Sequence, residues 1–372
     1  MKNVKSLCLV MAILFCITGC TKAVYIENQQ FVLTEAIDFD ENNKFVVYTS
    51  TPVFNGIAKD KYKITFARAN SMRISKEVIN SKTSGSLAYG KSQNVLIGKR
   101  LLQNRDAFPY LDVLFRDSRN EINANVIMID GNVKDVMYTN MSDKGRIASV
   151  IRDLVDSAYQ NRVAVQTSLQ QFHQQMKDKG MTPAITAMKP EKNELVISGT
   201  ALLHKDGTYA TSLNNQESAL LLLLQSDTKN IIPLSFHFAP ELFDTTEKMS
   251  FVSFNIKKAK NKLKVTFTDD HMTFDMGIKV SIELTEILFD LDIEAQKTKL
   301  EQVIAKQLQK ECEDLIKKAQ KYQIDPFQFG VEVRAHHYKD WKKAADNWGK
   351  AFSEATVHVS TQVEMKNIGV SE

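Results

Sequence analysis

The chain has 372 residues, of which 43% are hydrophobic and 25% are charged, so it is long enough for two or three folded domains. With 14 glycines and 7 prolines, it is neither collagen-like nor linker-rich. The net charge of +4 falls to +2 without Lys2 and Lys5, which lie in a segment that we expect to be removed. An excess this small gives no electrostatic basis for a nucleic-acid partner.

The first 19 residues have the pattern of an export signal. Lys2 and Lys5 make a basic start, and residues 7–17 form an uncharged apolar run of eleven residues. Such a run is too short to span a bilayer, which takes about 20 residues, but it is typical of a secretory signal peptide. We therefore predict a signal peptide at residues 1–19.

The end of this segment predicts a lipid anchor. Ile17-Thr18-Gly19-Cys20 places two small residues before a cysteine and resembles the lipobox of bacterial lipoproteins. The thiol of Cys20 would carry a diacylglyceryl thioether, and two or more acyl chains, such as palmitate, hold a protein stably on a membrane. The alternative is a plain signal peptide with a chance cysteine. We expect residues 20–372 to form an exported body that is tethered to a membrane through Cys20.

The first part of this body alternates strands and helices. Strands are predicted at residues 31–38 and 44–51, joined across residues 40–43 as a hairpin. The spacing Asp38-x-Asp40-x-Asn42 matches the start of a calcium loop. However, Asn43 stands where that loop needs glycine and Thr49 where it needs glutamate, so a simple turn is favoured. Further elements are expected as short strands at residues 95–98 and 126–129 and as helices at residues 101–117 and 146–180.

One segment, Gly85-Ser-Leu-Ala-Tyr-Gly90-Lys91-Ser92, matches the phosphate-binding P-loop pattern. A P-loop needs a hydrophobic strand before its first glycine and a helix that begins at its lysine. Here polar residues precede the glycine, and the strand-like run at residues 95–98 follows the lysine. We therefore predict a loop and a strand without a bound nucleotide.

Pro183, Pro190 and polar neighbours make residues 181–193 a candidate boundary between two domains, 20–190 and 191–372. The five leucines at residues 220–224 are interpreted as a core strand, because they are too few to span a membrane. Beyond the boundary, strands are expected at residues 194–204, 209–213, 218–225, 249–256, 262–267 and 277–284. The pattern predicts an α+β fold, with mixed or antiparallel sheets flanked by helices, in two or three subdomains after the signal peptide.

Residues 295–323 predict a long amphipathic helix, because apolar residues recur every three or four positions. Cys312 lies on the apolar face, so it is interpreted as a core residue and not as a nucleophile. The sequence contains no GxSxG, HExxH or CxxC motif, and its seven histidines show no metal-ligand spacing. We therefore assign no catalytic residue, no cofactor and no metal site.

The C-terminal residues carry the most specific pattern. Asp325-Pro-Phe-Gln-Phe-Gly330 predicts a helix cap and a short helical turn. Trp341, Trp348 and Phe352 would share one helix face with Ala345, which favours core packing over the alternative of a partner-binding surface.

An alternating strand at residues 357–363 and the sequence Asn367-Ile-Gly369 complete this pattern. Together, these C-terminal features closely resemble the signature of the Ger(x)C family, the C-subunit lipoproteins of nutrient germinant receptors in endospore-forming bacteria. The likeness extends over most of the mature chain, through residues 27–38, Gly90 to Gly98, Arg116-Asp117, residues 197–201 and Glu217-Ser218. One departure is Thr21-Lys22, which stands near where the family usually has Trp-Asp after the lipid cysteine.

The resemblance implies a non-enzymatic subunit, anchored by its lipid on the outer face of the spore inner membrane. Its partners would be an A subunit and a transporter-like B subunit, both integral to the membrane, and the nutrient would be bound by those other subunits. Such a protein would take part in nutrient-triggered germination of the spores formed in sporulation. The alternatives are an exported solute-binding lipoprotein and, third, a lipid-anchored hydrolase.

Overall fold

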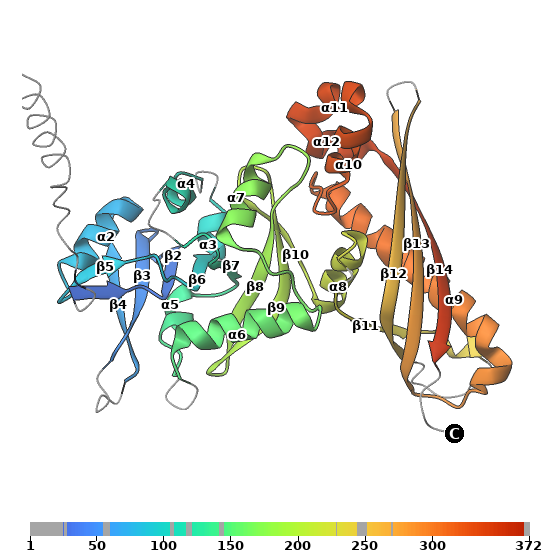
Figure 1. Ribbon diagram of the computed structural model, residues 1–372, viewed down its shortest axis with the longest axis horizontal. Coiled ribbons are helices and arrows are strands. Elements are labelled where there is room, and N and C mark those ends of the chain that lie inside the picture. Colours follow the sequence, from blue (N-terminus) through green and yellow to red (C-terminus); the bar gives the residue numbers. More distant parts are fainter. Residues whose placement is uncertain are drawn as a thin grey trace, which may run out of the picture.

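The structure is a computed structural model that describes residues 25, 28–54, 60–104, 108–116, 121–140, 145–227, 229–243, 251–268 and 271–367. The predicted signal peptide and the predicted lipidation site, Cys20, lie outside these residues. Two modules lie side by side along the long axis of the molecule (Figure 1). The N-terminal module contains an eight-stranded sheet and the C-terminal module a four-stranded sheet, which confirms the predicted α+β class with mixed sheets.

The eight-stranded sheet has the order β10-β9-β8-β7-β6-β2-β3-β4. Its strands are β2 (Thr34–Phe39), β3 (Phe45–Pro52), β4 (Tyr62–Arg68), β6 (Asn94–Gly98), β7 (Asn125–Ile129), β8 (Ala184–Glu191), β9 (Glu194–Leu203) and β10 (Tyr209–Leu213). β2 and β3 form the predicted antiparallel hairpin, whereas β2, β6, β7 and β8 run parallel in the centre. β6 and β7 are buried along their whole length because helices cover both faces of the sheet.

Two apolar clusters, one on each face, hold these helices. One face is covered by α2 (Met72–Asn80), α3 (Lys99–Leu102), α4 (Phe108–Arg116) and α7 (Leu169–Lys177), and the other by α5 (Val133–Met137) and α6 (Ile147–Gln160). The predicted helical stretches at residues 101–117 and 146–180 are therefore each divided into two helices. A short parallel ribbon of β1 (Gln29–Phe31) and β5 (Ser86–Ala88) lies beside the sheet.

The P-loop match adopts the predicted loop and strand. β5 lies within the motif, and a turn follows in which the Ser92 N–H donates to the Tyr89 carbonyl at 3.0 Å. The next element is β6, not a helix that begins at Lys91. The helix N-terminus that would bind phosphates is thus missing from this described segment.

The predicted domain boundary falls within continuous structure. Residues 184–191 form β8, and the tip of the β8–β9 hairpin lies near the predicted division between residues 190 and 191. β9 and β10 then complete the eight-stranded sheet, so the N-terminal module extends to Leu213.

The C-terminal module begins with α8 (Asn215–Leu224), and here the sequence prediction of a strand at residues 218–225 was wrong. Asn214 and Glu217 form a capping box, because each side chain accepts the backbone N–H of the other, at 2.9 and 2.8 Å. All five leucines of α8 are buried. A helix that is apolar on every side has no helical periodicity, which is why the run resembled a core strand.

The remaining elements of the module form a sheet, a long helix and a group of short helices at residues 329–354, which we call the helical cap. They are β11 (Ile232–His237), η2 (Pro240–Phe243), β12 (Phe251–Thr268), β13 (His271–Ile287), α9 (Ile293–Lys321), α10 (Phe329–His336), α11 (Tyr338–Ala344), η3 (Ala345–Asn347), α12 (Trp348–Glu354) and β14 (Thr356–Asn367). The strands predicted at residues 249–256 and 262–267 are one strand, β12, with an irregularity between Ile256 and Lys258. The predicted long helix and closing strand are confirmed as α9 and β14, and β14 lies parallel to β13.

Candidate functional site at the junction between the modules

A buried aspartate organises the helical cap. Asp325 follows α9, is fully buried, and accepts hydrogen bonds from the backbone N–H groups of Phe327, Phe329 and Gly330 at 3.1, 3.3 and 2.8 Å. It also accepts one from the indole Nε1 of Trp348 at 2.8 Å. Burial raises the pKa of Asp325 to about 6, although each of these donors favours the charged form. The prediction of Asp325 as an N-cap followed directly by a helix was wrong, because α10 begins at Phe329 with Gln328 as its N-cap residue. The Asp325 carboxylate still accepts the N–H groups of the first two residues of α10, and it also fixes α12 through Trp348.

The backbones of the two modules meet beside this aspartate. A Cβ atom on Gly330 would lie 2.7 Å from the carbonyl oxygen of Gly180 and 2.6 Å from the Trp348 ring, so the site has no room for a side chain. Gly180 belongs to the loop between α7 and β8, and Gly330 belongs to α10. Two glycines therefore permit a direct contact between the modules.

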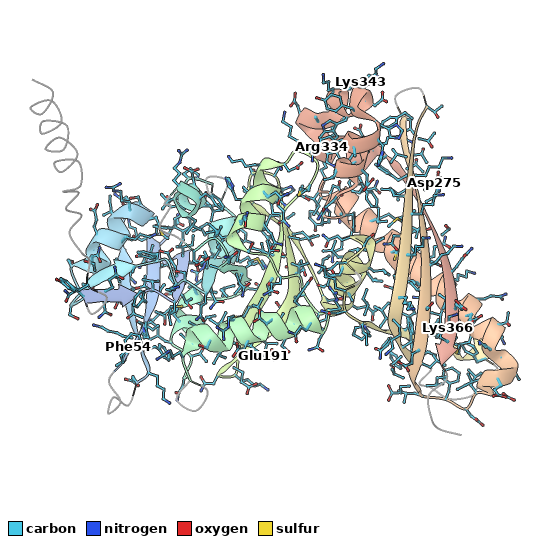
Figure 2. The ribbon with its side chains drawn as sticks, in the orientation of Figure 1. Phe54, Glu191, Asp275, Arg334, Lys343 and Lys366 are labelled. Atoms are coloured by element: carbon cyan, nitrogen blue, oxygen red, sulfur yellow. The ribbon has the colours of Figure 1, made fainter. Side chains whose placement is uncertain are left out.

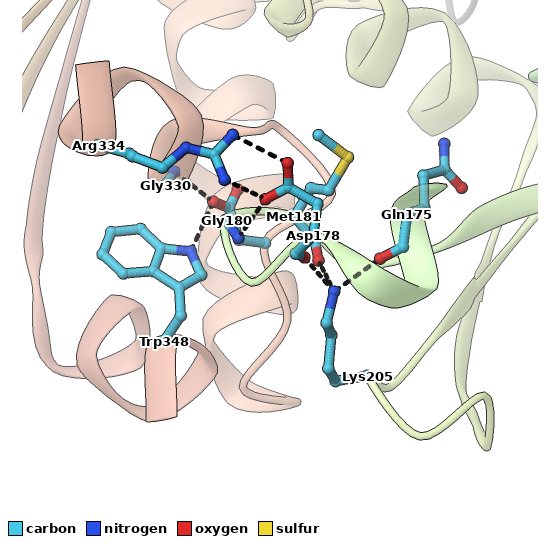
Figure 3. Close-up of polar contacts among 9 residues, drawn as sticks. Gln175, Asp178, Gly180, Met181, Lys205, Gly330, Arg334 and Trp348 are labelled. Carbon is cyan, nitrogen blue, oxygen red and sulfur yellow. Dashed lines mark hydrogen bonds and ion pairs between the residues drawn. The ribbon is translucent and has the colours of Figure 1, made fainter. Parts of the chain in front are cut away.

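Charged side chains reinforce the contact. Arg334 of α10 donates two hydrogen bonds of 2.8 Å to the carboxylate of Asp178, whose Oδ1 also accepts the Gly180 N–H at 2.8 Å (Figure 3). From the other side, Lys205 donates to the carbonyl oxygens of Gln175, Asp178 and Met181. Burial lowers the pKa of Lys205 to about 8. These contacts fix the loop between α7 and β8 against the helical cap.

A second connection joins α6 to the end of α8. The side chain of Arg162 is fully buried, and its Nη1 lies 3.0 Å from Oδ2 of Asp227. The hydroxyl of Tyr159 donates to the same oxygen at 2.6 Å. Because the largest apolar cluster also includes residues of β8 and β9 together with α8, the junction has both polar and apolar contacts. Its polar groups contact one another across the two modules, which is the chemistry of a structural joint.

The aromatic residues predicted to share a helix face lie in the interior, as favoured. Trp341, Trp348 and Phe352 are 5%, 3% and 0% exposed, and the two indole rings pack with centroids 5.1 Å apart. The face is built from α11, η3 and α12, so it is not one continuous helix. Cys312 is likewise fully buried on α9, and burial raises the pKa of its thiol.

A cavity of about 450 Å³ lies between the helical cap and the ends of β12 and β13. Phe267, Met272 and Val333 contribute to its apolar lining, and charged side chains of α11 and α12 stand at its rim. The rim charges form pairs within their own helices, such as Lys350 with Glu354 at 3.8 Å. The cavity therefore does not collect one kind of charge for a ligand.

The part of the chain that the structure describes shows neither a metal-binding cluster nor a membrane-spanning helix. Within these ranges, no group of three or more His, Cys, Asp or Glu residues could hold a metal ion. No described helix is both long and apolar enough to cross a membrane. Arg116 of the Arg116-Asp117 motif donates a hydrogen bond to Asp112 one turn earlier, and Asp117 lies outside the described residues.

Sequence reasoning missed the contacts that join the modules. Asp178 and Arg334 are 156 residues apart, and no local pattern links them. Gly180 was taken as the end of a helical block, although a glycine that follows a helix is also typical of a close backbone contact. The one part of the junction that a local sequence pattern indicated was the segment from Asp325 to Gly330.

Comparison with known proteins covers both modules. Residues 22–190 match the family model "Spore germination protein N-terminal domain", and residues 198–369 match "Spore germination B3/GerAC like, C-terminal". Spore germination protein GerQC of Bacillus cereus is 23% identical over 95% of this chain and 96% of its own length. Spore germination protein B3 of Bacillus subtilis (strain 168) is 21% identical over 74% of this chain and 73% of its own length. The crystal structure of the GerBC protein aligns with a TM-score of 0.55 and 18% identity, over 90% of this chain and 97% of that one, and so supports the fold.

Proposed function

Because the chain belongs to the Ger(x)C family of spore germination proteins, we propose that it is the lipid-anchored C subunit of a nutrient germinant receptor. The observation that carries the proposal is the match of both family models, which together extend from residue 22 to residue 369. In this role the protein assembles with the membrane-embedded A and B subunits on the outer face of the spore inner membrane. Its contribution is protein contact, not catalysis, and the nutrient is bound by the other subunits.

The rigid junction supports this role. A subunit that works through protein contact has to present surfaces in a fixed geometry. The contacts of Arg334 and Arg162, with the hydrogen bond from the Thr182 N–H to the Asp325 carbonyl, join the two modules in one arrangement. A solute-binding protein, in contrast, commonly closes its two lobes around a ligand. A joint in which glycine backbones are in direct contact opposes such a movement.

The anchor is tested with Cys20→Ala. The variant has no thiol for the diacylglyceryl group, so we expect it to accumulate as unprocessed precursor or to be released from the membrane. Mass spectrometry of the N-terminal peptide of the parent protein should find a lipidated Cys20. An unmodified mature N-terminus at another residue would contradict the anchor.

Assembly is tested by deletion and by recovery of partners. Loss of the protein should remove the response of spores to one set of nutrients and leave non-nutrient triggers active. Purification of the tagged full chain from spore membranes should recover the A and B subunits. If every nutrient response persisted and no such partner was recovered, the solute-binding alternative would replace this proposal, with the cavity beside the helical cap as its first candidate site.

A further inference from the structure

The most exposed large apolar side chains gather at one end of the molecule. Phe54 is 75% exposed and Tyr25 is 66% exposed, the two highest values among the large apolar residues that the structure describes. Phe54 follows β3 at the hairpin with the edge strand β4, where the Val53 N–H donates to the Lys61 carbonyl at 3.0 Å. Tyr25 leads into β1, and both β1 and β4 lie at the end of the N-terminal module that is far from the C-terminal module (Figures 1 and 2).

The same end carries exposed basic side chains. Lys61 and Lys63 are exposed at the start of β4, and the exposed Lys82 follows α2, where its Nζ donates to the Phe66 carbonyl of β4 at 3.0 Å. The nearby acidic groups are the exposed Asp60 and Glu77, and Glu77 lies 3.6 Å from Arg73. The Arg146 guanidinium lies nearest, with its carbon 5.6 Å from the centre of the Phe54 ring. Basic groups are therefore in excess at the Phe54 end of the module. Exposed aromatic residues beside lysines are typical of a surface that lies at a lipid headgroup layer.

The short segment between Cys20 and Tyr25 indicates that this surface faces the membrane. Four residues lie between Cys20 and Tyr25, so the five Cα–Cα steps of a fully extended chain span at most about 18 Å. An acyl anchor on Cys20 would therefore hold the β1 and β4 end close to the bilayer, whatever the conformation of the intervening residues. This step rests on the lipid anchor of the proposed function.

We propose that the β4 end of the N-terminal module docks on the membrane surface, with Phe54 inserted among the lipid headgroups and Lys61 and Lys63 facing anionic lipids. The docked surface orients the protein, because one acylated residue alone would leave the body free to rotate. The C-terminal module then points away from the bilayer, and its helical cap is held at a distance from the lipid.

The experiment places a probe at Phe54 in the full, lipidated chain. Phe54→Cys gives a selective labelling site for an environment-sensitive dye, because Cys312 is fully buried and lipidation blocks the Cys20 thiol. In phosphatidylglycerol vesicles we expect a blue shift of the dye and quenching by brominated acyl chains. Tyr338→Cys is the matched control, since Tyr338 is 56% exposed on α11 in the other module and its dye should stay in water.

Charge variants sharpen the test. Lys61→Ser and Lys63→Ser should each lower the inserted fraction on phosphatidylglycerol by about fivefold, the factor that a basic residue near an anionic surface contributes. The same changes should have little effect on phosphatidylcholine, and Lys260→Ser with Lys262→Ser on β12 should have little effect on either lipid. A dye at residue 54 that stays in water while Cys20 is lipidated would overturn the docking and leave the proposed anchor intact. Absence of the lipid from Cys20 would overturn both.

Discussion

The two modules are each organised by a buried aspartate, but the two carboxylates have different partners. Asp325 in the C-terminal module accepts four N–H donors and has the indole of Trp348 as its most distant partner in sequence. Asp38 in the N-terminal module accepts the Phe39 N–H at 2.8 Å and lies 4.0 Å from Arg100. Burial raises the pKa of both carboxyl groups to about 6. Neutral N–H donors accommodate both carboxylates, and Asp38 has a nearby cation in addition.

Removal of the Asp325 carboxylate should have the largest effect on the free energy of unfolding. Asp325→Ala leaves the Trp348 indole and three backbone N–H groups without an acceptor in a fully buried position. Because each unsatisfied buried donor costs about 1–3 kcal/mol, we expect a loss of ~4 kcal/mol or more in the free energy of unfolding. Chemical denaturation followed by tryptophan fluorescence measures the loss.

The control for this variant is Asp346→Ala. The side chain of Asp346 is 88% exposed and forms a surface ion pair with Lys179, so its loss should have little effect on the free energy of unfolding. Similar values for the two variants would show that the Asp325 hydrogen bonds do not organise the cap.

A smaller effect is expected from filling the glycine contact. Gly330→Ala would place a methyl group 2.7 Å from the Gly180 carbonyl and 2.6 Å from the Trp348 ring. Overpacking of this kind typically costs about 1–3 kcal/mol, and backbone atoms leave little scope for adjustment. The measurement is again the free energy of unfolding.

Gly277→Ala is the matched control. Gly277 lies in β13, and the nearest atoms to an added Cβ are 3.8 Å away, so this change should be close to neutral. The comparison fails if the two glycines tolerate alanine equally well.

The sequence predicted those parts of the fold whose signal is local. The β2–β3 hairpin, the buried strands β6 and β7, and the helix α9 each have a periodicity or a turn within a few residues. The role of Asp325 as an acceptor for the following backbone could be predicted for the same reason, since its donors follow within five residues, whereas the start of α10 at Phe329 could not. Local physics was sufficient for these elements.

Long-range contacts determine the parts of the fold that the sequence did not predict. The leucines of α8 resembled a strand because the helix is enclosed by the core on every side, which only the tertiary fold determines. Asp38 resembled the first ligand of a calcium loop, but its carboxylate turns inward to hydrogen-bond with the backbone of Leu101 and Val133. The inward carboxylate also requires a glycine at residue 98, because a Cβ atom there would lie 2.0 Å from Cγ of Asp38. No local pattern reveals this requirement.

The last predicted effect is on the pH dependence of stability, which should have opposite signs for Asp38 and its neighbour Asp40. The pKa of Asp38 is about 6 in the folded protein and about 4 in the unfolded chain, so folding favours its protonated form. The stabilisation from protonated Asp38 is fully present below about pH 4 and is lost as the pH rises to about 6. Asp38→Asn has no such loss. Relative to the parent, this variant should gain about 2 kcal/mol over that interval in urea unfolding curves measured at several pH values.

Asp40→Asn should show the opposite sign. A hydrogen bond from the Arg68 guanidinium lowers the pKa of Asp40, so the parent gains stability from this group as the pH rises through the ordinary range of an aspartate. The asparagine variant lacks that gain and should fall relative to the parent as the pH rises to about 4, by an amount that salt reduces because the pair is at the surface. The two positions are two residues apart, one buried and one on the turn, so opposite slopes would separate the effect of burial from that of ion pairing. Slopes of the same sign would mean that burial does not control the titration of Asp38.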